Sequence, residues 1–342
     1  MGRRRINAPR RGSLAYLPRG RASRPIGNIG FWPEVKSDKP KLLGFAGYKA
    51  GMSFMYVIGN TRGNPTFGQE IHSPVTIIDT PPLIVCGFRG YVACSSGLAS
   101  ILEVWSEKLP DDLGRLFRIP RQKTPDSIEA AQSAESVRAR EPTEIRALVA
   151  TQPRQSGSGH KKPELFEVKV AGGSIAEQLD YLKGLLGKEI QISEVFKEGE
   201  QVDVIGVTKG KGIQGAVKRW GVKTLQHKSR KTVRGVGTLG PWTPHYVMYT
   251  VPRAGQMGFH QRTEFNKRIL KIGGEGLNVV PDGGFQHYGT PDRSFVVLSG
   301  SVPGPAKRII KMRYAVRQSS TSEEKTVITY TPFRKTIGRG ET

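Results

Sequence analysis

Cysteine and long apolar runs are scarce in this sequence. It has two cysteines, Cys86 and Cys94, in no CxxC spacing, and no run near the roughly 18 apolar residues of a membrane-spanning helix. The first 25 residues contain arginine but no apolar stretch of a secretory signal. We therefore predict no disulfide framework, no membrane span and a reduced, cytoplasmic location, with both cysteines acting as small buried hydrophobes.

Sequence motifs for common catalytic chemistry are also missing. There is no GxxxxGK[ST], GxSxG or HExxH, and the six histidines show no ligand spacing with cysteines or carboxylates. GxGxxG occurs at 210–215 and 235–240, but no acid lies between Asp203 and Glu264, where a dinucleotide fold needs one about 20 residues further on. The sequence thus predicts no enzyme, no cofactor, no metal and no small-molecule substrate.

Positive charge is abundant and unevenly placed. The 342 residues include 53 Lys and Arg against 29 Asp and Glu, for a formal charge of +24. Residues 1–33 hold eight Arg and no acid, and residues 204–274 hold fourteen basic residues and one acid. Such charges repel one another within the Debye length of roughly 8 Å at physiological salt. We expect a polyanion to neutralise them, and nucleic acid is favoured over a membrane because Gly and Pro interrupt any amphipathic helix.

The length favours about two domains. Short β-rich runs separated by Gly and Pro begin near residue 41 and favour a barrel or sandwich, while 98–109 and 127–150 have helical apolar spacing. A further amphipathic helix is expected at 174–186. The predicted segments are a basic arm at 1–40, barrel strands at 41–97, a helical insertion at 98–163, barrel at 164–207, a basic central extension at 208–270, and barrel completion with a tail at 271–342.

Aromatic residues are interleaved with the basic residues of the extension, where they can stack on unpaired bases. Trp242 stands in Gly-Pro-Trp-Thr-Pro without a neighbouring apolar run, so we favour an exposed tip over packing on its own hairpin. Trp220 follows Ala216 and Val217, which favours an anchor at the base of the extension. Trp105 is expected in the core on a helix face.

Long motifs along the chain resemble the archaeal and eukaryotic branch of the large-subunit ribosomal protein L-three family over roughly residues 1–315. They are APRRGSLAYLPRGR (8–21), GFAGYKAGM (44–52), PVTIIDTPPLIVCGFRGYV (74–92), GLASILEVWSEKL (97–109), VTKGKGIQGAVKRWG (207–221) and GPWTPHYVMYTVPRAGQMGFHQRTEFNKRI (240–269). The resemblance implies a mainly β fold: a six-stranded β-barrel of the translation-protein type with a helical insertion, an extended N-terminal arm and a long basic central extension.

The resemblance also implies a role. The barrel would lie on the subunit surface, while the arm and extension enter large-subunit (23S-type) rRNA, with the tryptophan tip near the peptidyl transferase centre. Implied functions are early subunit assembly and an influence on aminoacyl-tRNA accommodation. The implied protein neighbours are of the L-fourteen and L-twenty-four-e type. The predicted rRNA-binding residues are Arg3, Arg4, Arg5, Arg10, Arg11, Arg19, Lys209, Lys211, Lys218, Arg219, Lys228, Arg230, Lys231, Arg234, Trp242, His245, Arg253, His260, Arg262, Lys267 and Arg268.

The sequence departs from the usual motifs of this family at two places, and two alternative functions remain open. Thr243-Pro244-His245-Tyr246 replaces the usual His-Pro-Ala-His, and no histidine precedes Arg230 in the usual position. An RNA-modifying enzyme and a translation factor are the alternative functions, although the missing P-loop argues against a GTPase. We expect the extension to be disordered or loosely ordered on its own and to fold on RNA, with phosphate neutralisation offsetting the entropy lost.

Overall fold

The computed structural model describes residues 10–35, 37–60, 63–118, 142–274, 281, 283–291, 294–317 and 326–331. The chain divides into two compact units. Unit 1 consists of Met1–Pro25 and Val207–Arg262, and unit 2 of Ile26–Gly206 and Thr263–Thr342. The described residues are mainly β, as the sequence predicts.

Strands dominate the described secondary structure. The strands are β1 (Lys41–Leu42), β2 (Gly44–Ile58), β3 (Glu70–Asp79), β4 (Leu83–Cys94), β5 (Gly97–Trp105), β6 (Glu144–Ala150), β7 (Leu165–Ala171), β8 (Glu189–Ile190), β9 (Gln201–Val207), β10 (Ile213–Gln214), β11 (Gly255–Gln256), β12 (Gln261–Gly273), β13 (Phe295–Ser299), β14 (Ile309–Tyr314) and β15 (Ile328–Tyr330). The helices are α3 (Ile175–Leu185), α4 (Ile192–Val195) and α5 (Ala216–Trp220), with 3₁₀ turns η1 (Asp111–Arg115) and η2 (Pro153–Gln155).

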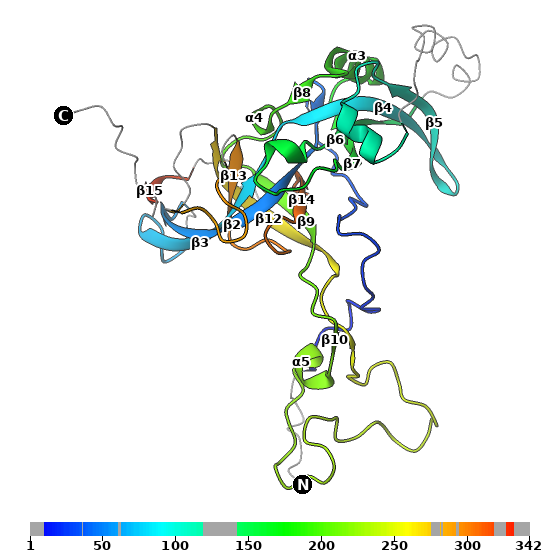
Figure 1. The fold of residues 1–342 in the computed structure, drawn as a ribbon, viewed down its shortest axis with the longest axis vertical. Coiled ribbons are helices and arrows are strands. Elements are labelled where there is room, and N and C mark those ends of the chain that lie inside the picture. The colour runs from blue at the N-terminus through cyan, green and yellow to red at the C-terminus, as the bar shows by residue number, and fades with distance from the viewer. Residues whose placement is uncertain are drawn as a thin grey trace, which may run out of the picture. The chain divides into compact units, whose positions relative to one another are not determined.

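Six strands form a closed ring (Figure 1). The hydrogen-bonded order is β14-β9-β12-β13-β3-β2, and β14 also pairs with β2, while β15 adds to the other edge of β2. The pairing of Phe295 with Asp79 sets the register of β13 against β3, and the pairing of Ile309 with Tyr48 sets that of β14 against β2. Because alternate side chains of a strand lie on the same face, the paired residues Phe45 and Met312 share one face of the ring, and both are fully buried.

A second sheet of unit 2 has the order β1-β7-β6-β4-β5, with β8 paired to β4. The strands at 41–97 and 164–207 are thus distributed between this sheet and the ring. Val85, Phe88, Ile145 and Val168 of the second sheet belong to the same buried cluster as the ring interior. One hydrophobic cluster of unit 2 is therefore shared by the two sheets, and a smaller one lies around Cys86, Leu113 and Ala150.

Helix α3 confirms the amphipathic helix expected at 174–186. Ser174 caps it by accepting a hydrogen bond from the Glu177 backbone N–H, in a capping box. Leu182 is fully buried and Leu179 packs against the core cluster at its side. The spacing of apolar residues located this helix because one of its faces is buried and the other is solvated.

The helical prediction for 98–163 is wrong in two described stretches. Residues 97–105 form β5 and residues 144–150 form β6, and both pair with β4. Apolar residues at 98, 101, 102 and 105 have helical spacing, but a turn at 95–96 folds them back on β4, and cross-strand pairing overrides the local period. Trp105 is accordingly half-buried on a strand, packed against Phe117. Residues 119–141 lie outside the described part of the chain.

A glycine also lies between two β-rich segments of the sequence that form a single strand in the structure. The β-rich runs at 42–49 and 52–59 look separate in the sequence, but residues 44–49 and 52–58 belong to one strand, β2, with a bulge between Lys49 and Gly51. A Cβ at Gly51 would lie 2.3 Å from the Phe285 ring, so the glycine admits a core ring rather than ending the strand. Of the two cysteines, Cys86 is buried as expected and Cys94 is half-buried.

The N-terminal segment belongs to both units. Residues 10–35 contain no helix or strand. From Ile26 onward they belong to unit 2, where Trp32 is buried and lies against Gly44. No helix among the described residues is long and apolar enough to cross a membrane.

Candidate nucleic-acid interface

Unit 1 contains only one sign of charge. Its segments, Met1–Pro25 and Val207–Arg262, carry 19 Lys and Arg and no Asp or Glu. Every cation in this unit is therefore without an acidic partner from the same unit. The charge predicted from sequence is concentrated in one compact body.

The base of unit 1 is organised around Trp220. Helix α5 ends at this residue because Gly221 follows with a left-handed φ of 67°, a conformation that glycine adopts without strain. The Trp220 ring is buried with Ala216 and Val222, and its Nε1–H donates to the Arg253 carbonyl at 2.9 Å. The structure confirms that Trp220 is an anchor at the base of the extension.

The N-terminal segment is fastened to this base. The Arg19 guanidinium carbon lies 3.8 Å from the centroid of the Trp220 ring, and that of Arg219 lies at 5.2 Å. The Ala22 N–H donates to the Phe259 carbonyl at 2.8 Å. Arg10 donates to the Thr250 carbonyl. Unit 1 is therefore built from two chain segments far apart in sequence.

Two stretches of the extension run antiparallel beside this base. The Thr208 N–H donates to the His260 carbonyl at 2.9 Å, and β10 pairs with β11 further along. Gly258 allows the close approach: it has a φ of +71°, and a Cβ there would lie 2.1 Å from the Lys209 carbonyl oxygen. Only glycine fits both requirements.

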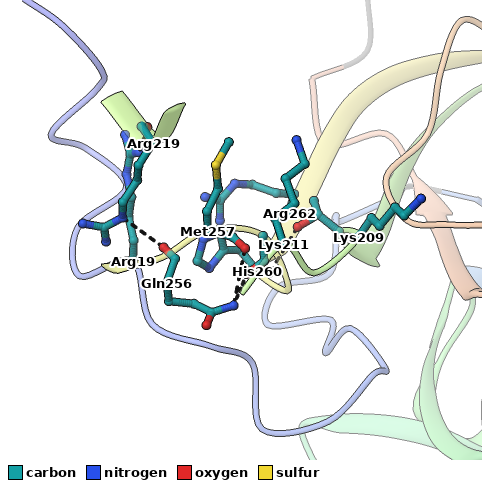
Figure 2. A pocket seen from close by; sticks show the side chains of 10 residues that line it. Arg19, Lys209, Lys211, Arg219, Gln256, Met257, His260 and Arg262 are labelled. Atoms are coloured by element: carbon teal, nitrogen blue, oxygen red, sulfur yellow. Dashed lines mark hydrogen bonds between the residues drawn. The ribbon is translucent and has the colours of Figure 1, made fainter. Parts of the chain in front are cut away.

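These stretches and the arm line a partly open basic pocket of about 360 Å³ (Figure 2). The pocket lies wholly within unit 1. Arg19, Lys209, Lys211, Arg219 and Arg262 supply its cations. The full lining is Arg19, Thr208, Lys209, Lys211, Arg219, Gln256, Met257, Gly258, His260 and Arg262.

Hydrogen bonds to the backbone hold the arginines of the basic pocket. The Arg219 Nε donates to the Gln256 carbonyl at 3.0 Å, the bond drawn in Figure 2, and another of its nitrogens donates to the Arg253 carbonyl at 3.0 Å. Arg19 donates to the carbonyls of Arg219 and Ser13 at 3.2 and 3.1 Å. The positions of both guanidinium groups are thus fixed by the fold.

Like charges meet in the basic pocket. Burial, followed by the charges of Arg219 and Arg262, lowers the pKa of the Arg19 guanidinium from its ordinary value. His260 is buried, and its Nδ1 lies 2.7 Å from the Gly20 carbonyl oxygen, which can only accept, so Nδ1 carries the proton and donates. The pocket therefore collects positive charge and N–H donors without a carboxylate.

Exposed aromatic rings lie in the segment around Trp242. Trp242 is 85% exposed, and the nearby Tyr246 and Tyr249 are also exposed. Trp242 touches the His245 ring edge-on, with centroids 5.7 Å apart. Its predicted exposure is confirmed, and the alternative of packing on its own hairpin is reduced to this single ring contact among the described residues.

The structure distributes the predicted site residues in four ways. Arg19, Lys209, Lys211, Arg219, His260 and Arg262 meet in the basic pocket. The exposed residues elsewhere in unit 1 are Arg10, Arg11, Lys218, Lys228, Arg230, Lys231, Arg234, Trp242, His245 and Arg253. Lys267 and Arg268 belong to unit 2, where Lys267 pairs with Glu264 at 2.9 Å. Arg3, Arg4 and Arg5 lie outside the described residues.

Sequence reasoning missed several residues of this site. Tyr16 carries the Arg262 guanidinium 4.6 Å above its ring, and its place among the arginines of the arm was the available signal. Thr208, Gln256 and Gly258 also line the basic pocket. Nothing in their local sequence marks them.

A mainly β unit joined to a unit of purely basic charge has the electrostatic footprint of a nucleic-acid-binding protein. Comparison with known proteins specifies the class further. The family model described as "Ribosomal protein L3" matches residues 1–332.

Curated relatives agree over nearly the whole chain. "Large ribosomal subunit protein uL3" of Archaeoglobus fulgidus is 47% identical, covering 98% of this chain and 100% of the relative. Proteins with the same name are 45% identical in Methanocaldococcus jannaschii (95% of this chain, 96% of the relative) and 49% identical in Methanoregula boonei (92% and 94%). The chain belongs to the ribosomal protein L3 family.

Proposed function

We propose that this chain is a structural constituent of the large ribosomal subunit and binds large-subunit rRNA directly through unit 1. The observation that carries the proposal is a compact body with 19 basic residues and no acidic one. Phosphate neutralisation supplies affinity for such a surface. The names of the relatives support the choice of partner.

The finer proposal concerns the two ends of unit 1. Trp242 is the exposed tip that reaches towards the peptidyl transferase centre, where the rings around it stack on unpaired bases. The base around Trp220 positions that tip. Through it the chain influences aminoacyl-tRNA accommodation, and the remaining basic residues support early subunit assembly in the cytoplasm.

Unit 2 has a different part in the proposal. Its charges include acids paired with bases, such as Glu144 with Arg146 at 2.6 Å and Glu167 with Arg89 at 2.8 Å. A balanced surface of this kind suits contacts with proteins better than contacts with phosphates. We assign to unit 2 the contacts with proteins of the L-fourteen and L-twenty-four-e type.

Sedimentation separates a resident subunit protein from a visiting translation factor. Large subunits from cells that produce the tagged full-length chain are centrifuged through sucrose at high salt. A subunit constituent stays with the subunits in a constant ratio to rRNA. Complete release into the supernatant would contradict the proposal and favour a transient factor.

A further inference from the structure

The basic pocket of unit 1 holds more positive charge than its surroundings can compensate. Arg19, Arg219 and Arg262 lie around one cavity of about 360 Å³, and no Asp or Glu occurs anywhere in the unit. We infer that this pocket is a preformed seat for one phosphate group of an RNA backbone. The inference rests on the proposed rRNA binding, and it assigns one phosphate of the bound RNA to a defined position on the protein.

The guanidinium groups are ordered without any ligand. Arg219 is fixed by two backbone carbonyls, and Arg19 is fixed by two others while it stacks on Trp220. A long side chain normally loses rotamer entropy when it binds. Here the fold has already imposed that loss, so the pocket differs from the freely solvated lysines elsewhere in the unit.

One donor in this arrangement is left without an acceptor. The Nε of Arg19 is buried and has no hydrogen-bond partner among the described residues. A buried donor without an acceptor costs free energy, and the neighbouring charges of Arg219 and Arg262 add repulsion. An anion in the basic pocket relieves the repulsion directly.

The donor set selects phosphate. Guanidinium groups present paired N–H donors that match the oxygens of a phosphate. A free nucleotide would need recognition of its sugar and base, but the lining has no carboxylate for ribose and His260 is its single ring. The exposed Lys209 and Lys211 continue the positive charge beyond the cavity, as a passing RNA chain requires.

The test is a scan of the RNA backbone with the full-length chain. Single neutral methylphosphonate linkages are placed along a bound large-subunit rRNA fragment, and affinity is measured for each. Two pocket variants, Lys211→Gln and Arg262→Gln, are compared with Lys228→Gln. Lys228 is an exposed lysine of the same unit outside the basic pocket, and its replacement removes the same charge.

We expect one linkage whose neutralisation lowers affinity about tenfold with the natural chain. That loss should largely disappear with both pocket variants, because the phosphate and the cation act on each other, and it should persist with Lys228→Gln. Equal losses at every linkage, or coupling no stronger for the pocket variants than for Lys228→Gln, would overturn the inference while leaving rRNA binding intact. Failure of the unmodified fragment to bind would overturn the proposed function itself.

Inorganic phosphate provides the second arm. Added to the RNA-free full-length chain and followed by the NMR signals of the arginine Nε–H groups, it is expected to bind weakly and to be displaced by the fragment. Tight phosphate binding that the fragment does not displace would assign the basic pocket to a free anion and overturn the inference.

Discussion

The guanidinium carbon of Arg19 lies 3.8 Å from the ring centroid of Trp220, a residue buried at the base of unit 1. This contact joins the N-terminal arm to the central extension. A cation over an indole contributes about 0.5–1 kcal/mol at exposed sites and about 2 kcal/mol or more when water is excluded. The base of unit 1 is therefore stabilised by packing around the buried Trp220 ring, whereas the Trp242 ring is exposed and makes few contacts.

Replacing Trp220 and Trp242 in turn should distinguish the structural role of the buried ring from the role of the exposed ring. Trp220→Ala removes a buried ring and the Nε1–H bond to Arg253, so local stability should fall by about 3–5 kcal/mol. Amide hydrogen exchange of residues 207–262 in the full-length chain measures the loss. Trp242→Ala, at an 85% exposed ring, should change that exchange by less than about 0.5 kcal/mol while altering tRNA accommodation in assembled subunits. Similar losses in both variants would show that the tip is also packed.

Two glycines of the extension provide a matched pair. Gly258 and Gly212 both have positive φ, +71° and +65°, so alanine strains either backbone. A Cβ at 258 would also lie 2.1 Å from the Lys209 carbonyl oxygen, whereas at 212 nothing lies within 4 Å. Gly258→Ala should therefore destabilise unit 1 by at least about 1 kcal/mol more than Gly212→Ala. Amide hydrogen exchange measures both effects. Equal losses of stability would show that the stretches around Lys209 and Gly258 can move apart at little cost.

Lys311 makes the stability of unit 2 depend on pH. Burial lowers the pKa of this amine to about 8, and it lies 4.7 Å from the Phe166 ring centroid. Because its pKa is lower in the folded chain than in the unfolded chain, the unfolded chain binds more protons between about pH 8 and 10.5, and stability rises with pH there. Lys311→Met should be more stable at pH 7, by up to about 3 kcal/mol, and this advantage should shrink towards pH 10.

Denaturant unfolding at several pH values checks this. Burial raises the pKa values of Tyr48 and Tyr314, so these residues also make stability depend on pH. Both are present in the natural chain and in Lys311→Met, so their contributions cancel in the difference between the two unfolding free energies. Lys197→Met, at an exposed site, should show no pH-dependent advantage. A constant difference between natural chain and Lys311→Met from pH 7 to 10 would contradict the assignment.

A buried ion pair joins strands β14 and β9 in the ring of unit 2. Arg313 donates to Asp203 at 3.1 Å, and the same carboxylate accepts the backbone N–H groups of Asn266 and Val316. Arg313→Met leaves the charge of Asp203 buried and should cost about 3–5 kcal/mol in denaturant unfolding. Arg115→Met breaks an exposed pair with Asp112 and should cost less than about 1 kcal/mol. Equal costs would mean that water reaches Asp203.

Charge distribution, α3 and the two tryptophans of the extension were predictable because each depends on local sequence. Leu182 and its neighbours mark a buried helix face, and the isolation of Trp242 from apolar residues marks an exposed ring. Strand β5 was not predictable from its spacing. Its partner β4 decides its conformation, and residues 98–105 satisfy the helical period by coincidence.

The basic pocket was predictable only in composition. Its residues come from three stretches, around 19, 208–219 and 256–262, which meet through the Trp220 anchor and the close approach at Gly258. Its cations stand out in sequence. Their common cavity depends on contacts across more than 200 residues, such as that between His260 and Gly20, which no local pattern encodes.

The salt dependence of rRNA binding tests the central claim, that unit 1 holds RNA by neutralising phosphates. The affinity of the full-length chain for a large-subunit rRNA fragment is measured over a range of salt concentrations. If roughly ten phosphates are neutralised, log K should fall with log salt at a slope of about −9. A slope shallower than about −3 would contradict the account.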